Sequence, residues 1–280
     1  MSTGPRLALL GLPWDRSSSF ERGAAAAPPH IRRALWSPST NTSTELGLAI
    51  EPATLDDRGD LTLGDDPPAA REAIERGVAA ILDDGGVPLL LGGDHSVTYP
   101  ALRAFRSRPP ASILHIDAHG DHYDEFPLPE PGQPSGRGDR YSHACPFARA
   151  MEEGLAGRLV QVGIRTMTPH LRAQALRFGV EVYGMERWAD APVEALPGPV
   201  YVSLDLDGLD PAFAPGVAHP EPGGLSTRDV VSLLHRIRAP IAGADVVEYN
   251  PAHDLRDLTA RVAAKLLKEL AAVAIRNGGA

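Results

Sequence analysis

Cysteine is almost absent from this chain of 280 residues. Its single cysteine, Cys145, has no second thiol with which to form an internal disulfide. The N-terminus also lacks the basic and apolar stretch of a secretory signal, and the first strand-like run begins at Leu7. Together these two absences predict a cytoplasmic protein.

Long apolar runs and an excess of positive charge are missing as well. No stretch approaches the ~20 apolar residues that a membrane-spanning helix needs, so we expect a soluble protein with no membrane partner. Lys and Arg number 27 against 36 Asp and Glu, which gives a net charge of -9. Affinity for a phosphate backbone depends on clustered Lys and Arg, so this balance argues against a nucleic-acid partner. It modestly favours a cationic ligand.

Short β-rich runs alternate with amphipathic segments along the chain. We expect strands at 7–10, 87–91, 112–116, 159–162, 200–204 and 244–247, and helices at 69–82, 169–178, 227–237 and 259–274. This alternation is typical of a parallel sheet covered by helices on both faces. The length fits one α/β domain over residues 1–280. The segment 127–140 is rich in Pro and Gly and is expected to be a surface loop.

Acidic residues and imidazoles follow four of the predicted strands. Their sequences are GGDHS at 92–96, DAHGD at 117–121, DLDGLDP at 205–211 and EYNP at 248–251. Ligands of parallel α/β sheets bind beyond the carboxyl ends of the strands. Residues two apart share one face of a strand, so Asp117, His119 and Asp121 converge if extended geometry continues to the end of the run. Asp205 and Asp207 are expected to converge by the same rule.

Four aspartates packed this closely carry negative charge that must be balanced. They repel one another unless pKa values shift or cations and basic partners lie between them, and two divalent metals would balance four negative charges. The oxygen-rich set, with His95 and His119 and without a thiolate, suits Mn(II) better than a structural zinc, while other divalent metals such as Fe, Co and Ni stay open. Two metals ~3.5–4 Å apart can activate a water molecule, which predicts a hydrolytic reaction. Each acidic dipeptide alone is more often a turn or a helix cap, and only their conjunction predicts a metal centre.

Several stretches together resemble the ureohydrolase family, which includes the arginases and agmatinases. They are "SSSFERGAAAAPPHIRRALW" at 17–36, "GGDHS" at 92–96, "DAHGD" at 117–121, "SLDLDGLDP" at 203–211, "PEPGGLS" at 220–226 and "DVVEYNP" at 245–251. The sequence of residues 140–154 and 214–230 is similar to that of plant-type arginases and agmatinases. The resemblance implies a single three-layer α/β/α domain with an eight-stranded parallel sheet, assembled as a homotrimer or homohexamer.

The resemblance also implies the residues of the site. Two Mn(II) ions per subunit would be held, one by His95, Asp117, Asp121 and Asp205, and the other by Asp117, His119, Asp205 and Asp207. Glu248 would anchor a guanidinium group, and a carboxylate can indeed accept paired N–H donors. Asp121 and His143 would carry protons. Substrate contacts are expected from Glu248, His143, His219 and Tyr123.

The implied reaction is hydrolysis of a small cationic guanidino compound to urea and a primary amine. In many arginases, specific residues bind the amino and carboxylate groups of arginine. This chain has other residues at those places, among them Tyr123, Thr166 and Thr168. His219 lies in a stretch near the expected guanidinium site that also differs. Agmatine, which would give putrescine, and arginine, which would give ornithine, are therefore nearly tied, with a slight lean to agmatine. Guanidino acids and formiminoglutamate follow.

Charges on the nearby loop leave this choice open. Acidic residues would suit a bare chain or an additional ammonium group, and basic residues would suit a carboxylate. The acidic candidates are Asp124, Glu125, Glu130 and Asp139, and the basic ones are Arg137 and Arg140.

Other classes of protein fit the pattern less well. A catalytically silent guanidine-binding or assembly protein would be indicated by loss of a metal ligand or of Glu248, and none is lost. A zinc deacetylase is disfavoured by the doubled Asp-x-Asp pattern. Among the remaining residues, His115 is expected to support a ligand, His122 either to line the pocket or to be structural, and Cys145 not to act as a nucleophile.

Overall fold

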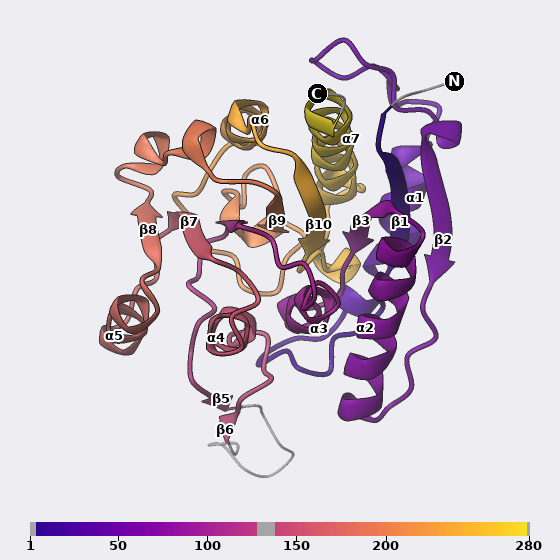
Figure 1. The fold of residues 1–280 in the computed structure, drawn as a ribbon. Coiled ribbons are helices and arrows are strands. Elements are labelled where there is room, and N and C mark those ends of the chain that lie inside the picture. The colour runs from indigo at the N-terminus through magenta and orange to yellow at the C-terminus, as the bar shows by residue number, and fades with distance from the viewer. Residues whose placement is uncertain (1–3, 128–137, 279–280) are drawn as a thin grey trace.

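A parallel sheet of eight strands runs through the centre of the molecule (Figure 1). The computed structural model describes residues 4–127 and 138–278. The strand order is β2-β1-β3-β10-β9-β4-β7-β8. The strands are β1 (Arg6–Gly11), β2 (Leu55–Asp60), β3 (Gly86–Leu91), β4 (Ser112–Ile116), β7 (Arg158–Ile164), β8 (Glu181–Gly184), β9 (Val200–Asp205) and β10 (Ile241–Val247). A second, two-stranded sheet pairs β5 (Phe126–Pro127) with β6 (Gly138–Asp139) in antiparallel fashion.

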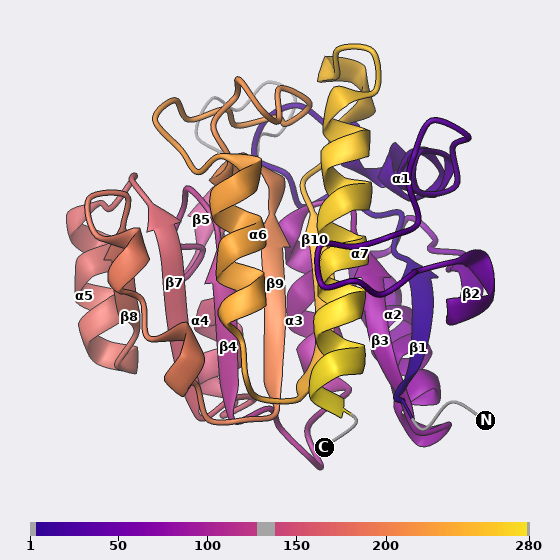
Figure 2. The same ribbon diagram turned by 90° about the horizontal axis from the view of Figure 1, so that it is seen from above.

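Helices cover both faces of the central sheet (Figure 2). One face carries α2 (Pro67–Asp83), α3 (Thr98–Arg103), α4 (Pro146–Glu152) and α5 (Pro169–Phe178), and the other carries α1 (Ala27–Leu35), α6 (Thr227–Arg236) and α7 (Leu258–Gly278). A separate apolar core fills each interface, with Ile74 and Phe147 in one and Ile31, Leu234 and Leu266 in the other. The predicted three-layer α/β/α architecture with an eight-stranded parallel sheet is confirmed.

Burial explains which strands the sequence reveals. All five residues of β4 are buried, and so are all six of β9, so each reads as a mostly apolar run with a few buried polar residues such as His115 and Ser203. The edge strand β2 has the sequence LDDRGD and is mostly exposed. Its Asp56 pairs with Arg6, while Asp57 and Asp60 pair with Arg32, so ion pairs and not apolar burial cover this edge. Hydrophobic periodicity gives no signal for such a strand, and β2 and β8 were not predicted from the pattern.

The long helices follow their sequence signals closely. At the start of α5 the Thr168 side chain accepts a hydrogen bond from the Leu171 N–H, and the helix ends at Gly179 with a φ of 66°. Both ends agree with the predicted helix over 169–178. The short helices α3 and α4, with six and seven residues, are too brief to show a helical period and were not predicted.

The four central strands bring the predicted motifs to one edge of the sheet. β3, β10, β9 and β4 are neighbours in this order. Their register aligns Leu91 with Val246, Val247 with Asp205, and Leu204 with Ile116, so the carboxyl ends of the four strands lie almost level. Each motif therefore opens into the same region. Among the helices of the described residues, none combines the length and apolar character needed to cross a membrane.

Candidate functional site

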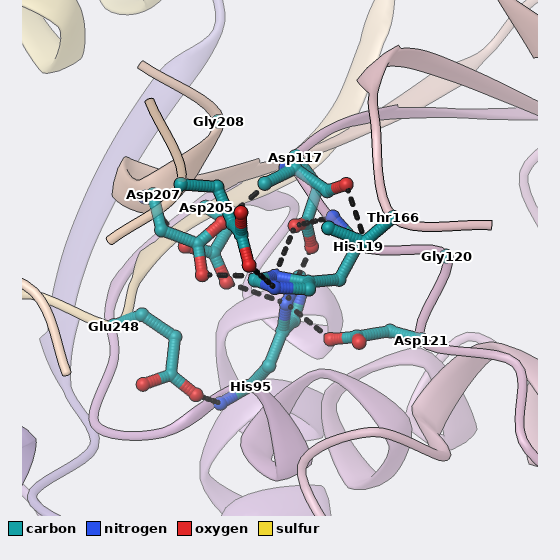
Figure 3. A network of polar contacts seen from close by, with 12 residues as sticks. His95, Asp117, His119, Gly120, Asp121, Thr166, Asp205, Asp207, Gly208 and Glu248 are labelled. Atoms are coloured by element: carbon teal, nitrogen blue, oxygen red, sulfur yellow. Dashed lines mark hydrogen bonds and ion pairs between the residues drawn. The ribbon is translucent and has the colours of Figure 1, made fainter. Parts of the chain in front are cut away.

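Tight turns directly after the strands bring the predicted ligands together. Strand β4 ends at Ile116, and Asp121 has a φ of 46°, so extended geometry does not continue through 117–121. After β9 the chain forms a 3-10 turn, Leu206–Gly208, in which the Asp207 N–H donates to Asp205 Oδ1 at 2.8 Å. The alternation expected from strand geometry is thus wrong here, although the side chains do converge (Figure 3).

A glycine allows this turn to approach the end of β4. A Cβ atom placed on Gly208 would lie 2.9 Å from both the nitrogen and the Cα of Asp117, closer than real Cβ contacts come. Only glycine leaves room for the backbone of the 206–208 turn at this point. The close approach holds Asp205 and Asp207 beside Asp117.

One imidazole nitrogen faces three carboxylates. His95 Nδ1 lies 2.9 Å from Asp205 Oδ2, 3.1 Å from Asp121 Oδ2 and 3.3 Å from Asp117 Oδ2. Burial alone would lower the pKa of His95, but the three carboxylates, which would accept from a proton on Nδ1, hold it well above its usual value. One ligand atom from each of the four residues lies within 4.8 Å of the others. These are the four residues expected to hold the first metal.

The other nitrogen of His95 shows that this group fits a cation. His95 Nε2 lies 2.9 Å from Ser203 Oγ, and the Ser203 hydroxyl donates to Asp245 Oδ1 at 2.6 Å. Ser203 Oγ therefore accepts from an Nε2–H, so a neutral ring would carry its lone pair on Nδ1. Nδ1 is buried and has no hydrogen-bond partner of its own. A lone pair that faces three carboxylates requires a proton or a metal ion between them.

A second group of ligand atoms adjoins the first. His119 Nδ1 lies 3.1 Å from Asp207 Oδ2 and 3.4 Å from Asp117 Oδ1. Asp117 thus turns one oxygen to each group, as a ligand shared by two ions would. Among the described residues, this second group contains Asp117, His119 and Asp207, whereas the expectation also placed Asp205 in it. The two groups are called the carboxylate-imidazole cluster below.

Repulsion inside the cluster is visible in its pKa values. Burial and the charges of Asp207 and Asp117 raise the pKa of Asp205 well above its usual range. Burial raises the pKa of Asp207 to about 7, although the charge of His119 opposes this. Two bound cations would remove the repulsion that causes part of these shifts. The donor set of carboxylate oxygens and imidazole nitrogens suits Mn(II) and its neighbours.

Buried polar side chains also hold the shared aspartate. His115 Nε2 lies 2.6 Å from Asp117 Oδ2, and the amide of Gln161 donates to His115 Nδ1 at 3.1 Å. All three side chains are fully buried. His115 contacts the predicted ligand Asp117 in the way expected of a supporting residue. His122 instead has its two ring nitrogens 2.6 Å from the Gly120 carbonyl oxygen and 2.9 Å from that of Leu171, so its role is structural.

A cavity of about 250 Å³ lies against the cluster. Its lining comes from the cluster, from the N-terminal segment and from the loops after β4, β7, β9 and β10. The lining residues are Ser19, His119, Asp121, Tyr123, Phe126, His143, Ala144, Thr166, Thr168, Leu171, Asp205, Asp207, His219 and Glu248. Four residues expected to contact substrate are among them, namely Glu248, His143, His219 and Tyr123.

Glu248 and His143 form a buried ion pair in this cavity. Glu248 Oε1 accepts from His143 Nδ1 at 3.0 Å and from the His95 backbone N–H at 2.9 Å. Burial would lower the pKa of His143, but the hydrogen bond to Glu248 and its charge raise that pKa to about 9. Burial would raise the pKa of Glu248, but its bond to His143 lowers it. At neutral pH the site therefore holds a carboxylate beside an imidazolium.

Ser19 joins this pair and was not singled out from the sequence. Its Oγ lies 2.8 Å from His143 Nε2 and 3.5 Å from His219 Nε2. The rings of His143 and His219 are 5.1 Å apart between centroids. A serine in a polar loop carries no chemical signature, and its membership of the quoted stretch at 17–36 was the one signal in the sequence.

Neutral side chains form the mouth of the pocket. The Tyr123 ring stacks on His170 at 5.3 Å with an interplanar angle of 7° and packs against Phe126. The Tyr123 hydroxyl lies 3.3 Å from Thr168 Oγ1. Thr166 donates to the Ala118 carbonyl oxygen at 3.1 Å. The name "pocket mouth" is used below for Tyr123, Phe126, Thr166 and Thr168.

The charged side chains considered as contacts of the substrate tail form ion pairs with other residues of the protein. Arg140 pairs with Asp124 at 3.3 Å and with Glu152 at 2.9 Å, and Arg149 also pairs with Asp124 at 3.2 Å. Among the residues that the structure describes, neither these nor Glu125 and Asp139 line the cavity. These ion pairs occupy Arg140 and Asp124 in this arrangement, and a contact of either residue with the tail stays a prediction. Glu130 and Arg137 lie outside the described residues.

Comparison with known proteins identifies one family over most of the chain. The model of the arginase family matches residues 5–272. Arginase 1, mitochondrial, of Arabidopsis thaliana is 47% identical over 94% of this chain and 80% of its own length. Guanidinopropionase of Pseudomonas aeruginosa is 36% identical over 95% of this chain and 85% of its own length.

A solved structure agrees with this match. The arginase from Medicago truncatula superposes with a TM-score of 0.89 and 43% identity, over 97% of this chain and 88% of that one. None of these relatives fixes where this chain resides or how many copies assemble. The cytoplasmic location and the trimer or hexamer stay predictions, and so does the single-domain organisation.

Proposed function

The chain belongs to the arginase family of dinuclear metal hydrolases that act on guanidino compounds, and from this premise we propose that it hydrolyses arginine to urea and ornithine with two Mn(II) ions. The identity to plant arginases supports arginine as the substrate. It outweighs the slight lean to agmatine drawn from the sequence. Membership in a hydrolase family, together with the complete donor set, argues against a catalytically silent protein.

We assign the metal ligands by position in the cluster. His95, Asp117, Asp121 and Asp205 would hold one ion, and Asp117, His119 and Asp207 the other, with Asp205 the candidate shared ligand. When bound, the two ions would supply Lewis acidity, which activates a water molecule at neutral pH. The unpartnered, buried Nδ1 of His95 is the observation that carries this assignment.

Glu248 is the proposed anchor of the guanidinium group. Its carboxylate lines the cavity beside the cluster, and its pKa is lowered, so it is ionised at neutral pH. A carboxylate can accept two N–H donors of a guanidinium in parallel, which fixes the plane of the substrate. This contact would orient the guanidinium carbon toward the cluster.

His143 is the proposed proton donor to the departing amine. An amine leaves readily when its nitrogen is protonated, and a pKa of about 9 keeps His143 in its acidic form at neutral pH. Asp121, which lines the cavity as part of the cluster, is the proposed proton acceptor from water. The two groups would together move the proton from the nucleophile to the leaving nitrogen.

Agmatine stays as a second candidate because of the pocket mouth. No Lys or Arg of the described residues lines the cavity, so a carboxylate on the substrate tail finds no cationic side chain there. Agmatine lacks that carboxylate. Neutral hydroxyl groups such as those of Tyr123 and Thr168 can accept either tail.

Substrate competition tests the proposal. Protein loaded with Mn(II) would be incubated separately with arginine, agmatine, guanidinobutyrate and formiminoglutamate, and urea and formamide would be measured. We expect urea from arginine at the highest kcat/KM. A higher kcat/KM for agmatine would replace the proposed substrate, and absence of urea from every guanidine would contradict the proposed function.

A further inference from the structure

The loop Asp15–Gly23 places a hydroxyl group over the proton-carrying histidine. The Asp15 carboxylate accepts from the Gly23 N–H at 2.7 Å and from the Ala25 N–H at 3.2 Å, which closes the base of the loop. Ser19 lies at its tip and lines the cavity. The loop comes from the N-terminal part of the chain, whereas His143 follows the loop after β4, so folding alone brings the two together.

Several hydrogen bonds fix the loop against the site. The Ser17 N–H donates to Asp94 Oδ2 at 2.9 Å, and Asp94 directly precedes the proposed ligand His95. The Ser17 carbonyl oxygen accepts from the backbone N–H of His143 at 3.1 Å. Ser17 and Asp94 are both buried. The hydroxyl of Ser19 is therefore presented to the His143 ring by a framework that also holds the backbone of His143.

Both nitrogens of the His143 ring are engaged. Nδ1 contacts Glu248 Oε1 at 3.0 Å, and Nε2 contacts Ser19 Oγ at 2.8 Å. A carboxylate only accepts hydrogen bonds, so Nδ1 carries a proton in either state of the ring. The proton that comes and goes is then the one on Nε2, the nitrogen beside Ser19.

We propose that Ser19 is a positioning residue that holds the His143 ring in both of its protonation states during catalysis. A hydroxyl group can accept a hydrogen bond from Nε2–H of the imidazolium and donate one to Nε2 of the neutral ring. An apolar residue can do neither. Ser19 thus keeps Nε2 at the cavity surface before and after the proton has moved.

The proton step balances without a further reactant. The C–N bond of the tetrahedral intermediate breaks, and its electron pair stays on the departing nitrogen. This nitrogen takes the Nε2 proton of His143, and the proton that Asp121 accepted from the attacking water passes through solvent to Nε2 and restores the imidazolium. Ser19 changes from acceptor to donor and back in each cycle. This role rests on the proposed function, because it presumes that His143 is the donor.

Removal of the hydroxyl group tests the inference. In Ser19→Ala we expect kcat to fall roughly tenfold with KM within about twofold of the wild-type value, because a misplaced acid slows proton transfer but leaves guanidinium binding intact. Ser19→Thr keeps a hydroxyl group and is expected to retain most of the rate. Ser18→Ala is the matched control, because the Ser18 hydroxyl lies 3.4 Å from Asp94 Oδ2 and belongs to the same loop.

A second readout does not depend on activity. Nitrogen NMR of the His143 imidazole reports the hydrogen bond at Nε2. Glu248 keeps the proton on Nδ1 in both proteins, and above pH 9 we expect the Nε2 signal of Ser19→Ala to shift relative to wild type, because Nε2 loses its hydrogen-bond donor. The same Nε2 signal and the same kcat in both proteins would overturn the inference, as would a change in KM alone, which would make Ser19 a substrate contact. If wild-type protein releases urea and Ser19→Ala equals it, this inference fails alone. If wild-type protein releases no urea, the proposed function fails.

Discussion

The carboxylate-imidazole cluster and the pocket mouth lie in one cavity but are built in different ways. The cluster stands at the carboxyl ends of β3, β4 and β9 and on the turns that follow them, and its aspartates are at most 6% exposed. The pocket mouth stands on the loops after β4 and β7, and its four side chains are only partly buried. Charged side chains make the cluster, whereas neutral ones make the mouth. Under the proposed function, residues at the ends of the sheet strands would carry out the reaction, and loop residues would select the substrate.

Removal of one cluster charge should have the largest effect. In Asp205→Asn the amide keeps the shape of the side chain but loses its charge, and we expect kcat to fall roughly a thousandfold, since metal Lewis acidity contributes several kcal/mol. Asp83→Asn is the control, because the Asp83 side chain is 82% exposed. Urea release under saturating Mn(II) measures the effect. A near wild-type rate in Asp205→Asn would mean that the cluster does not drive the reaction.

The pH profile should separate His143 from the cluster. The pKa of His143 is raised to about 9, so the acidic form persists through neutral pH and is lost as the pH rises through about 9. We expect kcat to decline above that pH. His143→Asn should lower kcat about a hundredfold, within the range usual for a lost general acid, and should remove this decline. A decline that is unchanged in His143→Asn would assign it to another group.

Ser203 tests whether the buried residues behind the cluster control metal binding. Ser203→Ala removes the hydroxyl group that accepts a hydrogen bond from His95 Nε2 and donates one to Asp245. We expect the affinity for Mn(II) to fall by about 10- to 100-fold, the range typical of such outer contacts. Metal titration calorimetry measures this change. Ser232→Ala, on the exposed side of α6, is the control, and equal affinities in the two variants would contradict the role of Ser203.

The smallest effect is expected at the pocket mouth. Tyr123→Phe removes one hydroxyl group that faces Thr168, and one neutral hydrogen bond contributes about 0.5–1.5 kcal/mol. The ratio of kcat/KM for arginine to that for agmatine should therefore change by roughly two- to tenfold. Arg140→Gln, whose guanidinium is engaged by Asp124 and Glu152, should leave this ratio unchanged. A larger change in Arg140→Gln than in Tyr123→Phe would reverse the assignment of the tail contacts.

The same contrast explains what the sequence could predict. Buried strands such as β4 read as apolar runs, and the acidic motifs that follow these runs indicate the cluster from residue types and spacing alone. The sequence could not indicate how Asp121 reaches the cluster, because a φ of 46° belongs to a turn that no periodicity describes. It could not indicate Ser19 either, since the contact with His143 joins segments 124 residues apart. Nor could the sequence indicate the ion pairs of Arg140, because they form only when the chain folds.

Metal stoichiometry tests the central claim most directly. Metal-free protein would be titrated with Mn(II), and the ions retained per chain would be counted by elemental analysis after dialysis. Two groups of ligands that share Asp117 predict two ions per chain in the wild-type protein and one in Asp207→Asn, which keeps the group around His95 intact. One ion or none in the wild-type protein would contradict a dinuclear centre.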